Sequence, residues 1–209
     1  SDVCSSDLFN QKEFTKAAIG YEILSNRVPN KFGEKALLQA ARIHFFELKD
    51  YEKAEAFFVK LKSYATIQEN RLEAMRGLLR SQCQLKHWSD ATQNAQELLN
   101  EKSIGADDRI LANLALARSS QLNGSCPEAI TYYRNVVALS KAAYGAEAQY
   151  EIASCHYALG RYADAEKAAF EVINKSGSYE DWVVKAYLLL GDTYVKQGDL
   201  FNAKATYQS

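Results

Sequence analysis

Apolar positions recur along most of this chain with the period of an amphipathic helix. Tyr187, Leu190 and Tyr194 stand at i, i+3 and i+7, which places their side chains on one face of a helix. Asp199 then precedes a second apolar segment, and aspartate is one of the residue types that cap helix N-termini. The pattern therefore predicts two consecutive helices joined by a short turn.

The same pattern occurs six times. Six heptapeptides align on a shared final alanine: QKEFTKA, LKDYEKA, LKHWSDA, NGSCPEA, LGRYADA and QGDLFNA. The alanines follow one another at intervals of 36 to 38 residues and are Ala17, Ala54, Ala91, Ala129, Ala165 and Ala203. Three residues before them stand Phe14, Tyr51, Trp88, Cys126, Tyr162 and Leu200. A helix pair cannot bury its apolar faces alone, so the repeats predict stacked pairs, with each alanine where two helices approach most closely.

This repeat resembles the tetratricopeptide repeat, whose consensus runs W-x2-L-G-x2-Y, then A-x3-F, then P. The last copy reads Tyr187-x2-Leu190-Gly191-x2-Tyr194, followed by Ala203-x3-Tyr207. The first copy supplies Ala17-x3-Tyr21 and then Pro29. The middle copies depart from the consensus at the small position before the turn, where they carry Arg42, Leu79, Ala117 and Ala153.

The resemblance covers residues 9–209 and implies an all-α fold, a right-handed solenoid of antiparallel helix pairs. We expect one such array with repeats at 9–30, 31–67, 68–104, 105–141, 142–177 and 178–209, the first and last incomplete. Repeats of the Sel1 type and pentatricopeptide arrays are the alternatives. The second of these binds RNA, which a net charge of −1 disfavours because RNA-binding domains are usually basic.

Residues 1–8, SDVCSSDL, fit the repeat poorly. The repeat spacing predicts a helix there, but the stretch is rich in Ser and Asp and its apolar residues have no helical period. A DNA string that resembles the end of a sequencing-library adapter translates to the same eight residues. We therefore expect residues 1–8 to be an adapter-derived leader on a bacterial fragment, with a native disordered terminus as the alternative. On this view Tyr21 lacks a proper first-helix partner.

The chain carries no recognisable catalytic or metal-binding motif. Cys83, Cys126 and Cys155 fall in different repeats and contain no C-x-x-C, so neither a disulfide framework nor a zinc site is expected. His44, His87 and His156 are likewise one to a repeat. No G-x-S-x-G, H-E-x-x-H or phosphate-binding loop occurs. The sequence therefore predicts a non-catalytic protein without a cofactor. No apolar run approaches the ~18 residues of a membrane span.

The family resemblance implies that the first helix of each pair lines a concave groove that holds an extended peptide or a partner helix. The candidate groove residues are Gln39, Ile43 and Phe46; Arg76, Arg80 and Cys83; Leu114, Arg118 and Gln121; Tyr150, Ser154 and Tyr157; and Leu188, Asp192 and Val195. The Lys and Asn pattern with which some members clamp a C-terminal carboxylate is not matched.

Three of these residues suggest a partner chemistry. Arg76 and Arg80 are four residues apart on one helix face, and Arg118 holds the same place in the next repeat as Arg80. Guanidinium groups bind carboxylates through two parallel hydrogen bonds, so the hypothesis is an acidic peptide. The alternative is that these arginines pair with local acids such as Glu73. The predicted function is a protein–protein interaction scaffold. The alternatives are an adaptor arm of a larger enzyme or cell-envelope protein, and an RNA-binding array. The compartment stays open.

Overall fold

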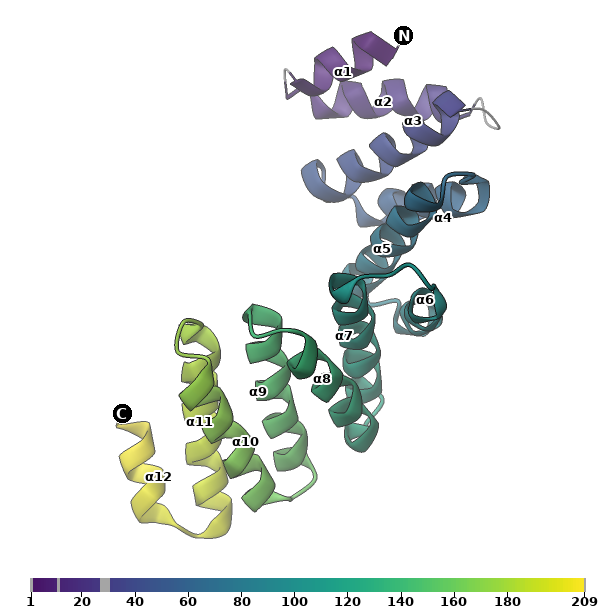
Figure 1. Ribbon diagram of the computed structural model, residues 1–209. Helices are drawn as coiled ribbons and strands as arrows, with labels where there is room; N and C mark the ends of the chain where they lie inside the picture. Colours follow the sequence, from purple (N-terminus) through teal and green to yellow (C-terminus); the bar gives the residue numbers. More distant parts are fainter. Residues whose placement is uncertain (1, 11, 27–30, 209) are drawn as a thin grey trace. The chain divides into compact units, whose positions relative to one another are not determined.

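The computed structural model describes residues 2–10, 12–26 and 31–208, which form helices and connecting turns without a strand (Figure 1). The helices are α1 Asp2–Asn10, α2 Phe14–Ser25, α3 Lys31–Arg42, α4 Tyr51–Tyr64, α5 Gln68–Leu85, α6 Trp88–Asn100, α7 Ala106–Leu122, α8 Cys126–Leu139, α9 Ala143–Ala158, α10 Tyr162–Lys175, α11 Glu180–Gln197 and α12 Leu200–Tyr207. A π-helical segment, η1 Ile43–Glu47, continues α3. The all-α helical-repeat fold predicted from the sequence is therefore confirmed.

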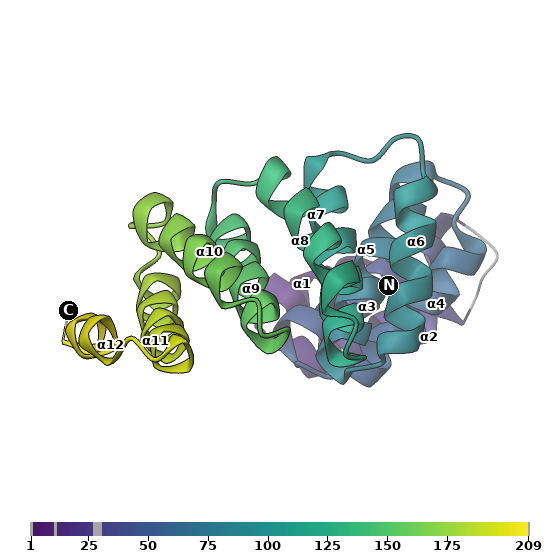
Figure 2. The same cartoon turned by 90° about the horizontal axis from the view of Figure 1, so that it is seen from below.

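The chain divides into two compact units. The N-terminal unit is Ser1–Glu101 and contains α1 to α6, and the C-terminal unit is Lys102–Ser209 and contains α7 to α12. Within each unit, successive helices pack against one another as antiparallel pairs. Figure 2, in which α11 and α12 are seen nearly along their axes, shows one such pair side by side.

The repeated sequence positions mark the same structural positions in every pair. The second helix of each pair begins at the residue three places before the repeated alanine, namely Phe14, Tyr51, Trp88, Cys126, Tyr162 and Leu200. All six repeated alanines are buried. A methyl group at this point lets the two helix backbones approach closely, so the predicted register of the repeats is confirmed.

The turn inside each pair contains one residue with left-handed backbone, two places before the second helix. In the C-terminal unit this residue is Gly124, Gly160 or Gly198, whose φ angles are 78°, 69° and 80°. In the N-terminal unit it is Lys12, Lys49 or Lys86, with φ angles of 61°, 54° and 61°. Left-handed backbone costs an L-residue ~1–2 kcal/mol, so the N-terminal turns carry a strain that the C-terminal glycines avoid.

The N-terminus differs from the sequence-based expectation, because α1 extends through residues 2–10 as a helix that packs on α2. Ser5 is buried against Gly20, and the hydroxyl oxygens of Ser6 and Tyr21 are 3.1 Å apart. Tyr21 is therefore buried with a partner, and the expectation that it lacks one is wrong. Packing on α2 stabilises this helix, whose own residues have weak helix propensity. Its adapter origin stays a hypothesis, and Pro29 lies outside the described residues.

Candidate functional site

In the C-terminal unit, polar side chains of the first helices α7 and α9 form a connected network. The guanidinium group of Arg118 contacts the carboxylate of Glu147. Gln121 donates from Nε2 to Oε2 of Glu151 at 2.8 Å and accepts at Oε1 from the hydroxyl of Tyr133 at 2.6 Å. These bonds link α7, α8 and α9, so the network holds its polar groups in defined positions.

Aromatic side chains continue this face from α9 to α11. The rings of Tyr150 and Trp182 have centroids 5.5 Å apart, and Nζ of Lys185 lies 3.9 Å from the centre of the Trp182 ring. Tyr157 meets Tyr162 edge to face at 5.7 Å. Because Tyr150 and Tyr157 are seven residues apart, they lie on the same side of α9 and present two half-buried rings.

The exposed side of α11 combines apolar and acidic groups. Leu188 and Val195 expose 54% and 46% of their surface. Asp192 lies between them in the sequence and accepts a hydrogen bond from the hydroxyl of Tyr207 at 2.5 Å. This bond raises the pKa of Tyr207 to about 12. The predicted groove residues Asp192, Leu188 and Val195 are thus all accessible to a partner.

Burial perturbs two groups of this face. Desolvation raises the pKa of Glu151 above its ordinary value, and the hydrogen bond from Gln121 opposes that rise. Desolvation also raises the pKa of Tyr150, with smaller contributions from the charges of Glu151 and Asp192. Tyr150 therefore lies near the two acidic groups Glu151 and Asp192 in a partly buried place, where electrostatic interactions are stronger than in bulk water.

Two predicted groove residues are corrected by the structure. Ile43 is buried in the N-terminal unit among Ala17, Tyr21 and Ala40, because its side of the helix faces α2. Leu114 is buried in the core of the C-terminal unit, where it packs in the same apolar cluster as Ile130 and Tyr133. Neither side chain is accessible to a partner. Both belong to the apolar stripe that holds the helix pairs together.

The remaining candidate groove residues are half-buried or exposed. Gln39 of α3 and Cys83 of α5 are half-buried, and so is Ser154 of α9 in the C-terminal unit. Phe46 is exposed and lies edge to face with Phe45, with centroids 4.8 Å apart. Arg80 is exposed.

The predicted arginine group involves local acids. Arg76 lies 2.9 Å from Glu69 and 3.5 Å from Glu73. Arg42 also binds Glu73, at 2.8 Å. Arg76 and Arg80 belong to the N-terminal unit and Arg118 to the C-terminal unit, so their convergence stays a prediction.

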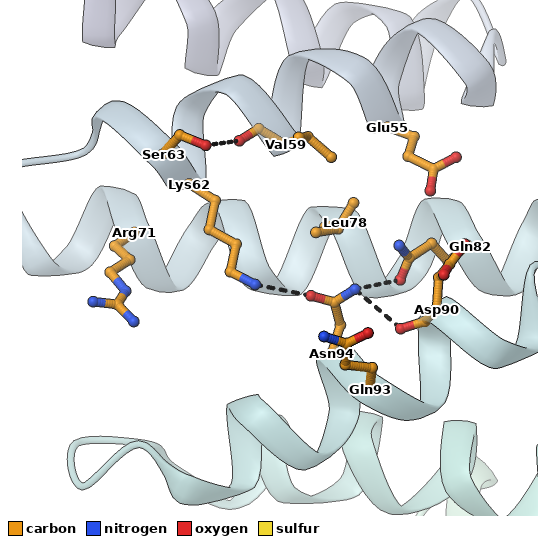
Figure 3. A pocket seen from close by; sticks show the side chains of 10 residues that line it. All are labelled: Glu55, Val59, Lys62, Ser63, Arg71, Leu78, Gln82, Asp90, Gln93 and Asn94. Atoms are coloured by element: carbon orange, nitrogen blue, oxygen red, sulfur yellow. Dashed lines mark hydrogen bonds between the residues drawn. The ribbon is translucent and has the colours of Figure 1, made fainter.

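A second feature, which sequence reasoning missed, is a groove of about 610 Å³ in the N-terminal unit (Figure 3). It lies between α4 and α6, and residues of α5 such as Leu78 and Gln82 also line it. Lys62 donates from Nζ to Asn94 at 2.9 Å and to Glu97 at 2.5 Å. The lining residues are spread over three consecutive helices, so no contiguous sequence motif identifies the groove.

These features define a helical-repeat protein whose first helices present polar and aromatic side chains. The described residues include no arrangement of side chains typical of a catalytic site. Two models of the tetratricopeptide repeat match the chain, one over residues 114–180 and one over residues 184–209. The C-terminal part of the chain therefore consists of tetratricopeptide repeats. No curated protein sequence matches it.

Solved structures show the same fold at low sequence identity. A tetratricopeptide repeat protein from Parabacteroides merdae is 16% identical with a TM-score of 0.69, over 98% of this chain and 75% of that one. The C-terminal part of a repeat protein from Cytophaga hutchinsonii is 16% identical with a TM-score of 0.71, over 100% and 77%. YrrB, described as a TPR protein with an unusual peptide-binding site, is 18% identical with a TM-score of 0.62, over 92% and 88%.

Family and fold support a coarse functional statement. Tetratricopeptide repeat proteins generally act as non-catalytic scaffolds for protein interaction, and the fold of this chain is of that kind. None of its described helices is both long enough and apolar enough to cross a membrane.

Proposed function

We propose that this chain binds an extended peptide or a partner helix along the first helices α7, α9 and α11 of the C-terminal unit, and that its role is non-catalytic. The observation that carries the proposal is the half-buried Tyr150 and Tyr157 of α9, with the exposed Leu188 and Val195 of α11, in the unit that holds the polar network. Aromatic side chains of this kind are enriched at protein interfaces, because they bury large areas at little cost in conformational entropy.

The proposal is tested with peptides selected on the immobilised chain from a random library and measured by fluorescence polarisation. Tyr150→Ala combined with Tyr157→Ala should weaken the selected peptides by at least about tenfold, the effect expected of two interface anchors. The matched control is Tyr144→Ala, an exposed tyrosine of α9 that is about 120° away from Tyr150 around the helix. Equal losses in the double variant and the control would contradict the proposal.

For the charge of a partner we propose an acidic segment at the α5 face of the N-terminal unit. Arg76 and Arg80 share this face, and a partner carboxylate would exchange with the exposed Glu69 for the guanidinium group of Arg76. Arg118 is matched by Glu147, and its face also carries Glu151 and Asp192. Arg80→Ala should therefore weaken an acidic peptide and Arg118→Ala should not. The reverse result would move the acidic site to the C-terminal unit.

A wider role, as an adaptor arm of a larger enzyme or cell-envelope protein, is compatible with the same faces and is proposed as the second possibility. It is favoured by the presence of two separate units, each with its own accessible first helices. Isolation of the native complex, followed by mass spectrometry of its components, distinguishes the two. The adaptor role is supported if the native complex contains a catalytic subunit and if that subunit is missing from the complex of the variant that carries both Tyr150→Ala and Tyr157→Ala.

A further inference from the structure

One end of the groove in Figure 3 brings together three metal-ligating side chains from two helices. Glu55 comes from α4, His87 is the residue that precedes α6, and Asp90 lies in the first turn of α6. One ligand atom from each of the three lies within 4.8 Å of the other two. Figure 3 shows the carboxylate of Glu55 pointing from α4 toward the end of the groove where Asp90 stands. His87 and Asp90 are exposed and Glu55 is half-buried, so the cluster lies at the surface of the N-terminal unit.

The distance between two of these atoms matches metal coordination. Nδ1 of His87 and Oε2 of Glu55 form a hydrogen bond at 3.2 Å, which a shared metal ion would replace. Zinc binds imidazole nitrogen and carboxylate oxygen at about 2.0–2.2 Å in a tetrahedral arrangement, which separates neighbouring ligand atoms by about 3.3 Å. Glu55 and His87 therefore already stand at the spacing that a shared ion requires. The carboxylate of the exposed Asp90 lies within 4.8 Å of both ligand atoms and is the third member of the set.

Neither carboxylate is neutralised by a lysine or an arginine of the described residues. Among the described residues, neither Lys nor Arg forms an ion pair with Glu55 or Asp90, and His87 is the one basic group beside Glu55. The basic residues that line the groove are engaged elsewhere, since Lys62 contacts Glu97 and Arg71 lies 3.2 Å from Glu101. Only 19% of the Glu55 side chain is exposed, so its charge is partly withdrawn from water. A divalent cation would relieve the repulsion between the two carboxylates.

The repeat register shows that this combination is particular to one join. In the preceding join of the N-terminal unit the same three positions hold Ala18, Asp50 and Lys53. In the C-terminal unit they hold Ile130, Arg161 and Asp164, and then Glu166, Asp199 and Asn202. These positions are equivalent in the repeat register, and of the joins compared, only that of Glu55, His87 and Asp90 combines one imidazole with two carboxylates.

We propose that Glu55, His87 and Asp90 bind a divalent transition-metal ion, Zn²⁺ in the first place, with water in the remaining position. One nitrogen and two carboxylate oxygens form a borderline ligand set of the kind that suits zinc rather than calcium or magnesium. The ion joins α4 to α6 across α5 and so links two successive helix pairs. Binding to the folded state alone also stabilises the N-terminal unit by mass action.

The test is isothermal titration calorimetry of the whole chain with ZnCl₂ in a buffer that does not chelate metal. We expect one saturable site, which Glu55→Gln and His87→Ala each weaken by at least about tenfold. The matched control is Asp164→Asn, which changes the equivalent acid of the C-terminal unit and should leave the affinity unchanged. Circular dichroism and melting in EDTA establish that each variant is folded.

The position of the bound ion is tested independently by the fluorescence of Trp88, which follows His87 in the chain. In a Trp182→Phe background, Cu²⁺ should quench the emission of Trp88 at one equivalent, and His87→Ala should abolish that quenching. The proposal is overturned by equal zinc affinity of Glu55→Gln and the parent, which would place the ion at another site such as a cysteine. It is equally overturned by the absence of saturable binding up to about 1 mM Zn²⁺.

Discussion

Gly77 of α5 lies directly against the ring of Phe58 of α4. A Cβ atom added at position 77 would stand 2.2 Å from Cζ of Phe58, closer than any real contact. Phe58 is itself only 2% exposed and packs with Leu37, Ala54 and Leu78. The glycine is thus a packing requirement, which lets two consecutive helix pairs of the N-terminal unit approach each other.

Gly77→Ala should therefore destabilise the chain by about 1–3 kcal/mol through overpacking, despite the higher helix propensity of alanine. The matched control is Gly191→Ala, where the added Cβ would stand 2.3 Å from the ring of Tyr207. Tyr207 is 48% exposed and can rotate away, so the loss there should be much smaller. Urea denaturation of the two variants measures the difference. Equal losses would mean that Phe58 has room to move.

The lysines in the left-handed turns offer a stabilising substitution. Lys86 has φ of 61° and ψ of 29°, so Lys86→Gly should raise the free energy of unfolding by roughly 0.5–1 kcal/mol, the backbone strain less the entropy that glycine adds to the unfolded chain. Gly160→Ala, at the same place in the C-terminal unit, should lower it by a similar amount. Thermal melts of both variants check the two opposite signs, and a destabilised Lys86→Gly would show that the turn is not strained.

The repeated alanines are predicted to be intolerant of larger side chains. Ala54 and Ala165 are fully buried where paired helices meet, so Ala54→Leu and Ala165→Leu should each destabilise by about 1–3 kcal/mol. Ala56→Leu and Ala163→Leu place the same substitution at exposed positions of the same two helices and serve as controls. Melting temperatures that do not separate buried from exposed positions would contradict the assigned register.

The buried carboxylate of Glu151 predicts a pH dependence. Burial raises its pKa in the folded chain above the unfolded value, so the folded state binds the proton more tightly. Its contribution to stability is then lost as pH rises from the unfolded pKa through the folded pKa. Glu151→Gln should consequently stabilise the chain at pH 7 relative to the parent and make little difference below the unfolded pKa of about 4.3.

Denaturant titrations of Glu151→Gln and the parent at both pH values measure this effect. Glu180→Gln alters an exposed acid of α11 and serves as the control, with no expected change in the pH profile of stability. A variant less stable than the parent at pH 7 would show instead that the hydrogen bond from Gln121 outweighs the cost of burying the charge.

Local pattern and repeat register predicted the fold of this chain because the relevant forces are local and periodic. An amphipathic helix is recognisable from residues three and four apart, and the six alanines with their preceding residues locate each helix pair. The same register identified most of the accessible first-helix positions, including Tyr150, Tyr157 and Asp192. It failed at Ile43 and Leu114, where an apolar residue on the predicted face turns toward a neighbouring helix and is buried.

What only the tertiary structure decided depends on contacts between residues that are 15 or 32 positions apart in the chain. The helix of residues 2–10 exists because Ser5 and Ser6 pack on Gly20 and Tyr21, not because its own residues favour a helix. Glu55 and His87 likewise meet only because two second helices flank α5. Sequence periodicity states which face of a helix is apolar, whereas the partner of each polar group follows from how the helices pack.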